Sequence, residues 1–170
     1  MAFLGGSGQD RMMVAVLRDS ISRVRPMGEA DLLEVAHIEQ GTFPDPWPLN
    51  SFRECLASGH HCLVLERDNS IDAYGIMSIE IGSAHILNLC VRRELRQRGI
   101  GRRLLHHLLQ VAEVSQVEAV FLEVRASNQP AIQLYYTTGF VQISVRKDYY
   151  PSETGPEDAL ILMRELEIAN

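Results

Sequence analysis

The sequence lacks the features that mark membrane proteins, secreted proteins and several enzyme classes. No apolar run approaches the ~20 residues that span a bilayer, and the N-terminus shows neither the charged nor the apolar segment of a secretory signal. We therefore expect a cytoplasmic protein with no membrane partner. The motifs His-Glu-x-x-His and Gly-x-Ser-x-Gly are also absent, which argues against a zinc protease and a serine hydrolase.

Cysteine is scarce, and its placement argues against structural disulfides and metal binding. The three cysteines, Cys55, Cys62 and Cys90, are odd in number and form no Cys-x-x-Cys pair, so we expect reduced, structural thiols. The histidine pairs 60–61 and 106–107 consist of adjacent residues, whose side chains point apart on a strand or a helix. We expect no metal site.

Length and charge favour one globular domain that binds a small anion. A chain of 170 residues suits a single core, and the net charge of -6 argues against a nucleic-acid partner. Six arginines nevertheless fall between positions 92 and 103. Such a cluster on an acidic chain indicates a small polyanionic ligand, although a solvated helix end would give the same pattern.

The hydrophobic pattern predicts one α/β domain over residues 20–166, preceded by a flexible extension at 1–19 and followed by a tail at 167–170. Adjacent strands in the first half predict an antiparallel meander. Alternating strands and helices in the second half predict parallel crossovers, so that helices flank a mixed central sheet. After a short strand near 21–24, the expected strands span 61–67, 71–81, 85–91, 119–125, 140–145 and 159–166, with a loop at 149–157. The expected helices span 27–40, 49–56, 100–114 and 128–138.

A phosphate-binding turn is the firmest functional feature. Arg96-Gln97-Arg98-Gly99-Ile100-Gly101 joins the strand ending at Val91 to an amphipathic helix. Glycines let successive backbone N–H groups turn inward, and a helix N-terminus adds free amides and the positive end of its dipole. The turn has neither the dinucleotide pattern Gly-x-Gly-x-x-Gly nor the nucleotide pattern Gly-x-x-x-x-Gly-Lys. By itself it predicts an anion site whose ligand is unassigned.

This turn resembles the signature Gln/Arg-x-x-Gly-x-Gly/Ala of the GNAT acetyltransferase family, and the resemblance extends over residues 20–166. It is narrower for the RimI-type ribosomal-protein alanine N-acetyltransferases within that family. The segments that carry the narrower similarity are Phe43–Trp47, Asn88–Val91, Leu122–Asn128, Leu134–Phe140, Tyr149–Pro151 and Glu157–Ala159. The resemblance implies a GNAT fold and acetyl-coenzyme A (acetyl-CoA) as cosubstrate, with no metal.

The resemblance also implies a role for each matching residue. Glu123 would be the general base and Tyr135 the general acid. The backbone at the end of the strand would align the acetyl and pantetheine part of the cofactor, and the glycine turn would cradle its pyrophosphate. The implied cofactor-binding residues are Leu89, Cys90, Val91, Gln97, Arg98, Gly99, Ile100, Gly101, Arg102 and Asn128.

Acetyl transfer to an amine needs both a base and an acid. An α-amino group with a pKa of about 7.7–8.0 is mostly protonated at neutral pH, and the departing thiolate gains from a proton donor. Glu123 interrupts an apolar strand, where partial burial would raise the pKa of its carboxyl toward neutrality and suit it to take up a proton. Its side chain could also face solvent or pair with Arg125. Tyr135 could be a core residue, and the pattern alone does not choose between it and Tyr136. Asn128 could also cap the helix that follows it.

The narrower resemblance implies an acceptor: the N-terminal alanine of a small-subunit ribosomal protein, bound by a monomeric enzyme between loops 43–47 and 149–157. Trp47, Tyr149 and Tyr150 suit the grip on a short peptide. Acidic residues in the same segments could favour a basic peptide: Asp45, Glu153, Glu157 and Asp158. Two alternatives remain open from the sequence, namely acetylation of a lysine side chain or small-molecule amine, and a non-catalytic acyl-CoA-binding module.

Overall fold

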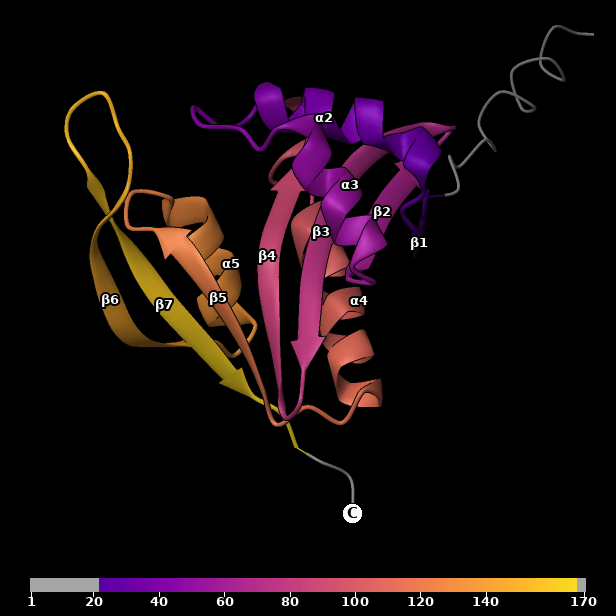
Figure 1. Ribbon diagram of the computed structural model, residues 1–170. Helices are drawn as coiled ribbons and strands as arrows, with labels where there is room; N and C mark the ends of the chain where they lie inside the picture. Colours follow the sequence, from indigo (N-terminus) through magenta and orange to yellow (C-terminus); the bar gives the residue numbers. More distant parts are fainter. Residues whose placement is uncertain (1–21, 168–170) are drawn as a thin grey trace, which may run out of the picture.

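One mixed sheet of seven strands forms the centre of the computed structural model, which describes residues 22–167 (Figure 1). Its strand order is β1-β2-β3-β4-β5-β7-β6. The expected extension at 1–19 and most of the tail at 167–170 lie outside the described residues. The strands are β1 (Ser22–Pro26), β2 (His61–Arg67), β3 (Ser70–Glu80), β4 (Ser83–Val91), β5 (Ala119–Arg125), β6 (Val141–Tyr150) and β7 (Glu157–Glu165).

Helices cover both faces of this sheet, as the sequence pattern predicted. Side chains alternate across β3, so Tyr74 and Ile76 pack with one helix pair, whereas Met77 packs with the other. The first pair is α2 (Leu32–Gln40), which follows the short 3-10 helix η1 (Glu29–Asp31), and α3 (Leu49–Ala57). The second pair is α4 (Ile100–Val114), which follows the 3-10 helix η2 (Arg93–Leu95), and α5 (Gln129–Thr137). None of the helices within residues 22–167 combines the length and the apolar character needed to cross a membrane.

The strand directions confirm the expected mixed sheet. Strands β1 to β4 form an antiparallel meander, and the turn between β2 and β3 holds Asp68 and Asn69 at φ of 51° and 63°. These are the left-handed values that a two-residue hairpin turn requires. Strands β4 and β5 pair in parallel. Strands β5 and β6 also run in the same direction, but β7 lies between them, antiparallel to both.

Strand β6 is longer than expected, and the predicted loop at 149–157 was wrong at its start. Tyr149 and Tyr150 lie in the strand, which continues past a bulge. Asp158 holds this bulge, because its carboxylate accepts hydrogen bonds from the Asp148 amide at 3.0 Å and from Lys147 Nζ at 2.8 Å. The sequence hides the strand because β6 is an edge strand exposed along nearly its whole length, so a core-facing stripe is missing.

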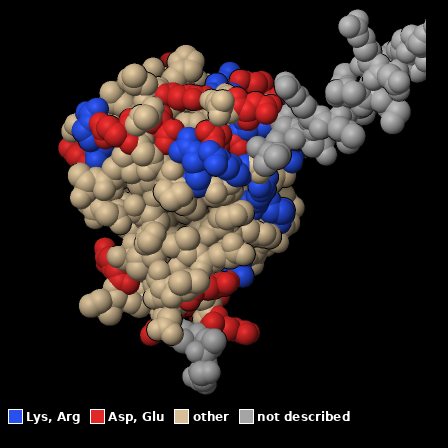
Figure 2. Space-filling model, turned by 90° about the vertical axis from the view of Figure 1, so that its right-hand side faces the viewer, with Lys and Arg blue, Asp and Glu red and all other residues tan. Residues whose placement is uncertain are grey.

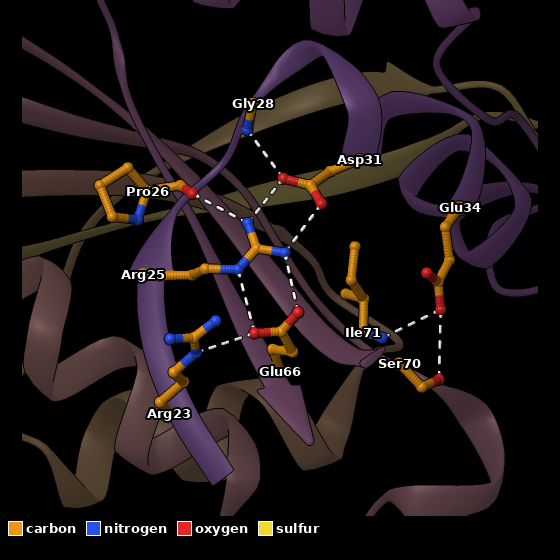
Figure 3. Close-up of polar contacts among 9 residues, drawn as sticks. All are labelled: Arg23, Arg25, Pro26, Gly28, Asp31, Glu34, Glu66, Ser70 and Ile71. Atoms are coloured by element: carbon orange, nitrogen blue, oxygen red, sulfur yellow. Dashed lines mark hydrogen bonds and ion pairs between the residues drawn. The ribbon is translucent and has the colours of Figure 1, made fainter. Parts of the chain in front are cut away.

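An ion-pair network lies at the opposite edge of the sheet, which is formed by β1 (Figure 3). The Arg25 guanidinium lies between two carboxylates, 2.8 Å and 2.9 Å from the oxygens of Asp31 and 3.1 Å from Glu66. Arg23 reaches Glu66 at 2.9 Å. Seen from the side that carries β1, the upper part of the surface accordingly mixes basic and acidic side chains, whereas its centre is mainly uncharged (Figure 2).

Candidate active site

Strands β4 and β5 part halfway along, and this opening is the first element of the site. They pair only from Ser83–Ile86 to Ala119–Leu122, and beyond that point they diverge (Figure 1). Strand β4 also bulges at Leu87, because Met77 pairs with Ile86 whereas Ile76 pairs with Asn88. The backbone of the following segment, 89–91, therefore has no strand partner on the β5 side in the described part of the chain. Such an edge can pair with an extended, amide-containing ligand, and the pantetheine arm of acetyl-CoA is one.

The glycine turn supplies a dense set of free backbone amides. Gly99 caps α4 with φ 75° and ψ 3°, and Gln97 also adopts a left-handed φ of 60°. The first backbone bond after the turn joins the Arg103 amide to the Gly99 carbonyl at 3.0 Å. Across the described chain, the six amides of residues 97–102 find no acceptor. Together with the positive end of the α4 dipole, they fit two linked phosphates.

The two glycines of the turn are required for different reasons. Gly99 faces open space, so its left-handed backbone is what favours glycine there. At Gly101 the reason is close approach. A Cβ would lie 3.3 Å from Val91 Cγ2 and 3.4 Å from Leu134 Cδ2, so the first turn of α4 sits tightly between the end of β4 and α5.

The arginine cluster around this turn is only partly available to a ligand. Arg98 is exposed and makes no hydrogen bond or ion pair within the described residues, and Arg96 donates only a long 3.4 Å bond to the Val91 carbonyl. Three others are held by protein partners: Arg92 by Glu34 at 2.7 Å, Arg102 by Thr137 at 2.6 Å, and Arg103 by the Ser22 carbonyl at 2.8 Å. Within the described residues, Arg93 is exposed and unpaired, and of the six arginines only Arg92 pairs with an acidic side chain. The partners of Arg102 and Arg103 are neutral, so these bonds redirect the two guanidinium groups without cancelling their charge.

Glu123 lies beside the opening between the strands. The alternation of β5 buries Val120, Leu122 and Val124 against α4 and α5, so Glu123 projects from the opposite face. Its side chain is 30% exposed and lies 3.4 Å from Arg146 Nη1 on β6. The sequence had offered Arg125 as its partner. Arg125 instead pairs with Glu157 at 3.4 Å and stacks over the ring of Tyr150.

The structure distinguishes Tyr135 from Tyr136, which the sequence could not. Tyr135 is 7% exposed and packs edge-on against Phe140, whereas Tyr136 is 44% exposed and bonds to Gln142. The Tyr135 hydroxyl makes no hydrogen bond to the described protein, yet no fully enclosed polar atom there lacks a partner. This hydroxyl is therefore nearly, but not completely, enclosed by the described protein. Burial raises the pKa of Tyr135, so its proton is retained at neutral pH.

Tyr150 stands near both Glu123 and Tyr135. Burial, followed by the negative charge of Glu123, raises the pKa of Tyr150 to about 12, and Tyr150 is in turn close enough to raise the pKa of Tyr135. The sequence suggested Tyr150 as a peptide contact but did not place it beside both candidates. That proximity arises because β6 continues to Tyr150 and its Glu157 partner begins β7.

Two further residues predicted to bind the cofactor, Asn128 and Cys90, have different surroundings. Asn128 caps α5, since its Oδ1 accepts a bond from the Ala131 amide at 3.3 Å, and its Nδ2 makes no hydrogen bond within residues 22–167. Cys90 is only 3% exposed, and burial raises the pKa of its thiol, which argues against a nucleophilic thiolate. All three cysteines are free and buried. Within residues 22–167, no cluster of histidine, cysteine or acidic side chains could hold a metal ion.

Two of the four acidic residues expected to favour a basic peptide are engaged within the protein. Glu157 accepts a bond from the Ser127 amide at 2.7 Å. Hydrogen bonding from the side chain and the amide of Ser127, with the Arg125 contact, lowers the pKa of the Glu157 carboxyl. Asp158 is held by Lys147, which likewise lowers its pKa. Asp45 and Glu153 are exposed and form no ion pair with the described part of the chain.

Known proteins match both the sequence and this architecture. The profile of the Acetyltransferase (GNAT) family matches residues 32–140. The ribosomal protein bS18-alanine N-acetyltransferase of Salmonella typhimurium is 35% identical over 136 residues, which cover 80% of this chain and 92% of that protein. The crystal structure of the ribosomal-protein-S18-alanine N-acetyltransferase from Escherichia coli has a TM-score of 0.83 at 31% identity, covering 88% of this chain and 97% of that one.

A more distant neighbour shares the fold. It is the structure of the NatC complex bound to Gag peptide and CoA, with a TM-score of 0.77 at 17% identity over 86% of this chain and 99% of that chain. The family profile and the two closer relatives cover most of the chain, and the amide-rich turn and open strand edge fit coenzyme A. This chain therefore belongs to the GNAT acetyltransferase family and is an acetyl-CoA-dependent N-acetyltransferase.

Proposed function

We propose that this enzyme transfers the acetyl group of acetyl-CoA to the α-amine of an N-terminal alanine on a small-subunit ribosomal protein. The proposal rests on the amide turn at the end of β4 and on Glu123 beside the opening between β4 and β5. Burial raises the pKa of Tyr135 most, and Tyr135 is close enough to Tyr150 on β6 and Cys90 on β4 for both to raise it further. The acceptor is suggested by the relatives, whose names specify alanine on ribosomal protein bS18.

In this proposal, the backbone holds most of the cosubstrate. The amides of residues 97–102 bind the pyrophosphate, with Arg98 beside them. The backbone of Leu89, Cys90 and Val91, which lacks a strand partner on its β5 side within the described residues, bonds to the pantetheine arm as a neighbouring strand would, and Asn128 adds a side-chain contact. The thioester then lies in the opening between β4 and β5, with Glu123 projecting from one face of β5 and Tyr135 packed on the other.

Glu123 and Tyr135 handle the protons of the reaction. Glu123 takes one proton from the incoming ammonium, directly or through a water, and releases it to solvent. The neutral amine attacks the thioester carbonyl, a C–N bond forms, and the C–S bond breaks. As the amide forms, the second proton of the amine passes to the departing sulfur by way of the Tyr135 hydroxyl. This hydroxyl gives its own proton to the sulfur and takes up the amine's, so the coenzyme leaves as a thiol. Because burial raises the pKa of Tyr135, its hydroxyl is a protonated hydrogen-bond donor for the departing sulfur.

The acceptor peptide would lie at the end of the sheet where β4 and β5 finish. The loop between α2 and α3 and the loop between β6 and β7 both lie at that end (Figure 1). The first loop carries Trp47, and the paired rings of Tyr149 and Tyr150, 4.9 Å apart, lie near the second. Exposed Asp45 and Glu153 favour a basic peptide. Every group in this scheme comes from one chain, so a monomer suffices.

Peptide competition tests the acceptor. The enzyme and acetyl-CoA are incubated with three matched peptides: one with a free N-terminal alanine, one with another free N-terminal residue, and one with a blocked N-terminus and an internal lysine. We expect the alanine peptide to be acetylated fastest, at its α-amine, as read by mass spectrometry. Acetylation of the blocked peptide alone would overturn the proposal in favour of a lysine acetyltransferase. Binding of acetyl-CoA without any transfer would favour a non-catalytic module.

A further inference from the structure

A buried carboxylate outside the proposed catalytic pair joins three parts of the molecule. Glu39, near the C-terminal end of α2, is 1% exposed. Its Oε1 accepts a hydrogen bond from the Trp47 amide at 2.9 Å. Its Oε2 accepts one from the Tyr74 hydroxyl on β3 and one from Asn88 Nδ2 on β4 at 3.2 Å. All three partners are neutral. The hydrogen bonds therefore fix the positions of these three groups and do not form an ion pair.

The loop that Glu39 holds has few other ways to be fixed. Prolines at 44, 46 and 48 have no N–H group, so within residues 44–48 only the amides of Asp45 and Trp47 can donate. Glu39 takes the Trp47 amide through its carboxylate. Its backbone carbonyl also accepts the amides of Thr42 and Phe43, each at 3.0 Å. One residue therefore anchors both ends of the loop.

The other side of the same carboxylate touches the strand proposed to hold the thioester. Asn88 follows the bulge at Leu87 and directly precedes the segment 89–91. Three aromatic rings also pack in a row between the loop and β3. The ring centroids of Trp47 and Phe52 lie 5.5 Å apart, and those of Phe52 and Tyr74 lie 5.6 Å apart. The β4 backbone is also held by its ladder with β3, whereas within the described residues the Trp47 amide bonds to Glu39 alone.

We propose that Glu39 is a positioning residue, which holds the acceptor loop 41–48 in register with the acetyl-binding end of β4. This rests on the proposed function, because it assigns the loop to the acceptor. Loss of the Glu39 acceptors frees the loop but leaves β4 in its ladder. The apparent affinity for the peptide therefore falls, whereas binding of acetyl-CoA does not.

Steady-state kinetics of two substitutions test this assignment. Glu39→Met removes every side-chain oxygen acceptor, whereas Glu39→Gln keeps one for the Trp47 amide. We expect the Met variant to raise the peptide KM about tenfold or more, with the acetyl-CoA KM changed less than about twofold, and the Gln variant to recover most of the loss. Glu66→Gln is the control, since it breaks a carboxylate network remote from the site and should change the melting temperature without changing the peptide KM. Equal changes in both KM values for Glu39→Met would overturn the assignment.

Tryptophan fluorescence and hydrogen exchange need no acceptor peptide, so they test the positioning role of Glu39 separately from the proposed function. Trp47 is the sole tryptophan of the chain, so acrylamide quenching of its fluorescence reports on the loop. We expect faster quenching in Glu39→Met than in wild type, Glu39→Gln or Glu66→Gln. In the wild-type protein, the Trp47 amide should exchange its hydrogen at least ~10-fold more slowly than the Asp45 amide, relative to their unfolded rates. Equal protection of the two amides would overturn the positioning role even if Glu39→Met fails to fold. A failed peptide assay beside protected Trp47 would instead overturn only the proposed function.

Discussion

Arg146 reaches across β7 to place its Nη1 3.4 Å from Oε1 of Glu123. Strands β5 and β6 flank β7 at this point, because Glu123 on β5 and Ser144 on β6 both pair with Ile161 of β7. The arginine side chain is 49% exposed and the glutamate side chain 30% exposed. An ion pair this open is worth only ~0.2–1 kcal/mol. A pair of this strength can break when another cation approaches the carboxylate.

Substitutions at this pair should separate the proposed base from its supporting contact. Glu123→Gln removes the proton acceptor and should lower kcat by ~10²-fold or more. Arg146→Met removes the exposed ion pair and the contact of the guanidinium with the Tyr149 ring, so we expect kcat/KM to change by no more than ~5-fold. Initial rates at saturating acetyl-CoA, with CoA affinity measured by calorimetry, check both values. A Glu123→Gln enzyme of normal turnover would remove Glu123 from the mechanism.

Tyr135→Phe should lower turnover by ~10²-fold or more while leaving the fold intact. The ring keeps its packing against Phe140, and the lost hydroxyl makes no bond to the described protein, so the melting temperature should stay close to that of wild type. Tyr136→Phe is the matched control one residue away. Its hydroxyl contacts Gln142 at 3.4 Å on the exposed side of α5, so its turnover should be unchanged. Equal effects of the two substitutions would contradict the assignment of the acid to Tyr135.

Gly99→Ala should weaken CoA binding through the backbone alone. A Cβ at this position meets open space, but φ is +75°, and a left-handed conformation costs an alanine ~1–2 kcal/mol. We expect the Kd for CoA to rise about tenfold as the turn relaxes. Gly99→Asn is the informative comparison, because asparagine tolerates left-handed φ better than alanine and should bind more tightly than the alanine variant. Calorimetric titration with CoA measures both, and the same Kd for the two variants would argue against a backbone cause.

The stability of the fold should fall in acid through the network at Arg25. The hydrogen bonds from Arg25 hold the pKa of the Asp31 carboxyl below its usual range. A lowered folded-state pKa means that this contribution is complete above the unfolded-state pKa of ~3.9 and is lost as the pH falls through the lower folded-state value. Asp31→Asn should therefore cost about 1–2 kcal/mol at pH 7. Urea unfolding from pH 7 to pH 3 should show a shallower acid loss in the variant than in wild type.

Local patterns were enough to predict most elements and the glycine turn before α4. The helix at 100–114 follows from the apolar spacing of Leu104, Leu105 and Leu108, all of which are buried. The turn before it follows from glycine placement, because a left-handed cap and a close helix approach are backbone requirements that few other residues meet. Strand β6 could not be delimited in this way. Its residues face solvent, and its end is set by the Asp158 contacts from β7.

The sequence by itself determined the fold class, the glycine turn before α4 and the candidate residue types, because these depend on local backbone preferences and on hydrophobic periodicity. Tertiary structure alone decided which groups meet. Tyr135 is buried and Tyr136 is exposed. Glu123 pairs with Arg146 instead of Arg125, and Arg92 pairs with Glu34. Glu39 bonds to Trp47 and Asn88. These partners lie on different strands and helices. Their distances depend on how the sheet opens and how its edges pair, and no local pattern encodes that.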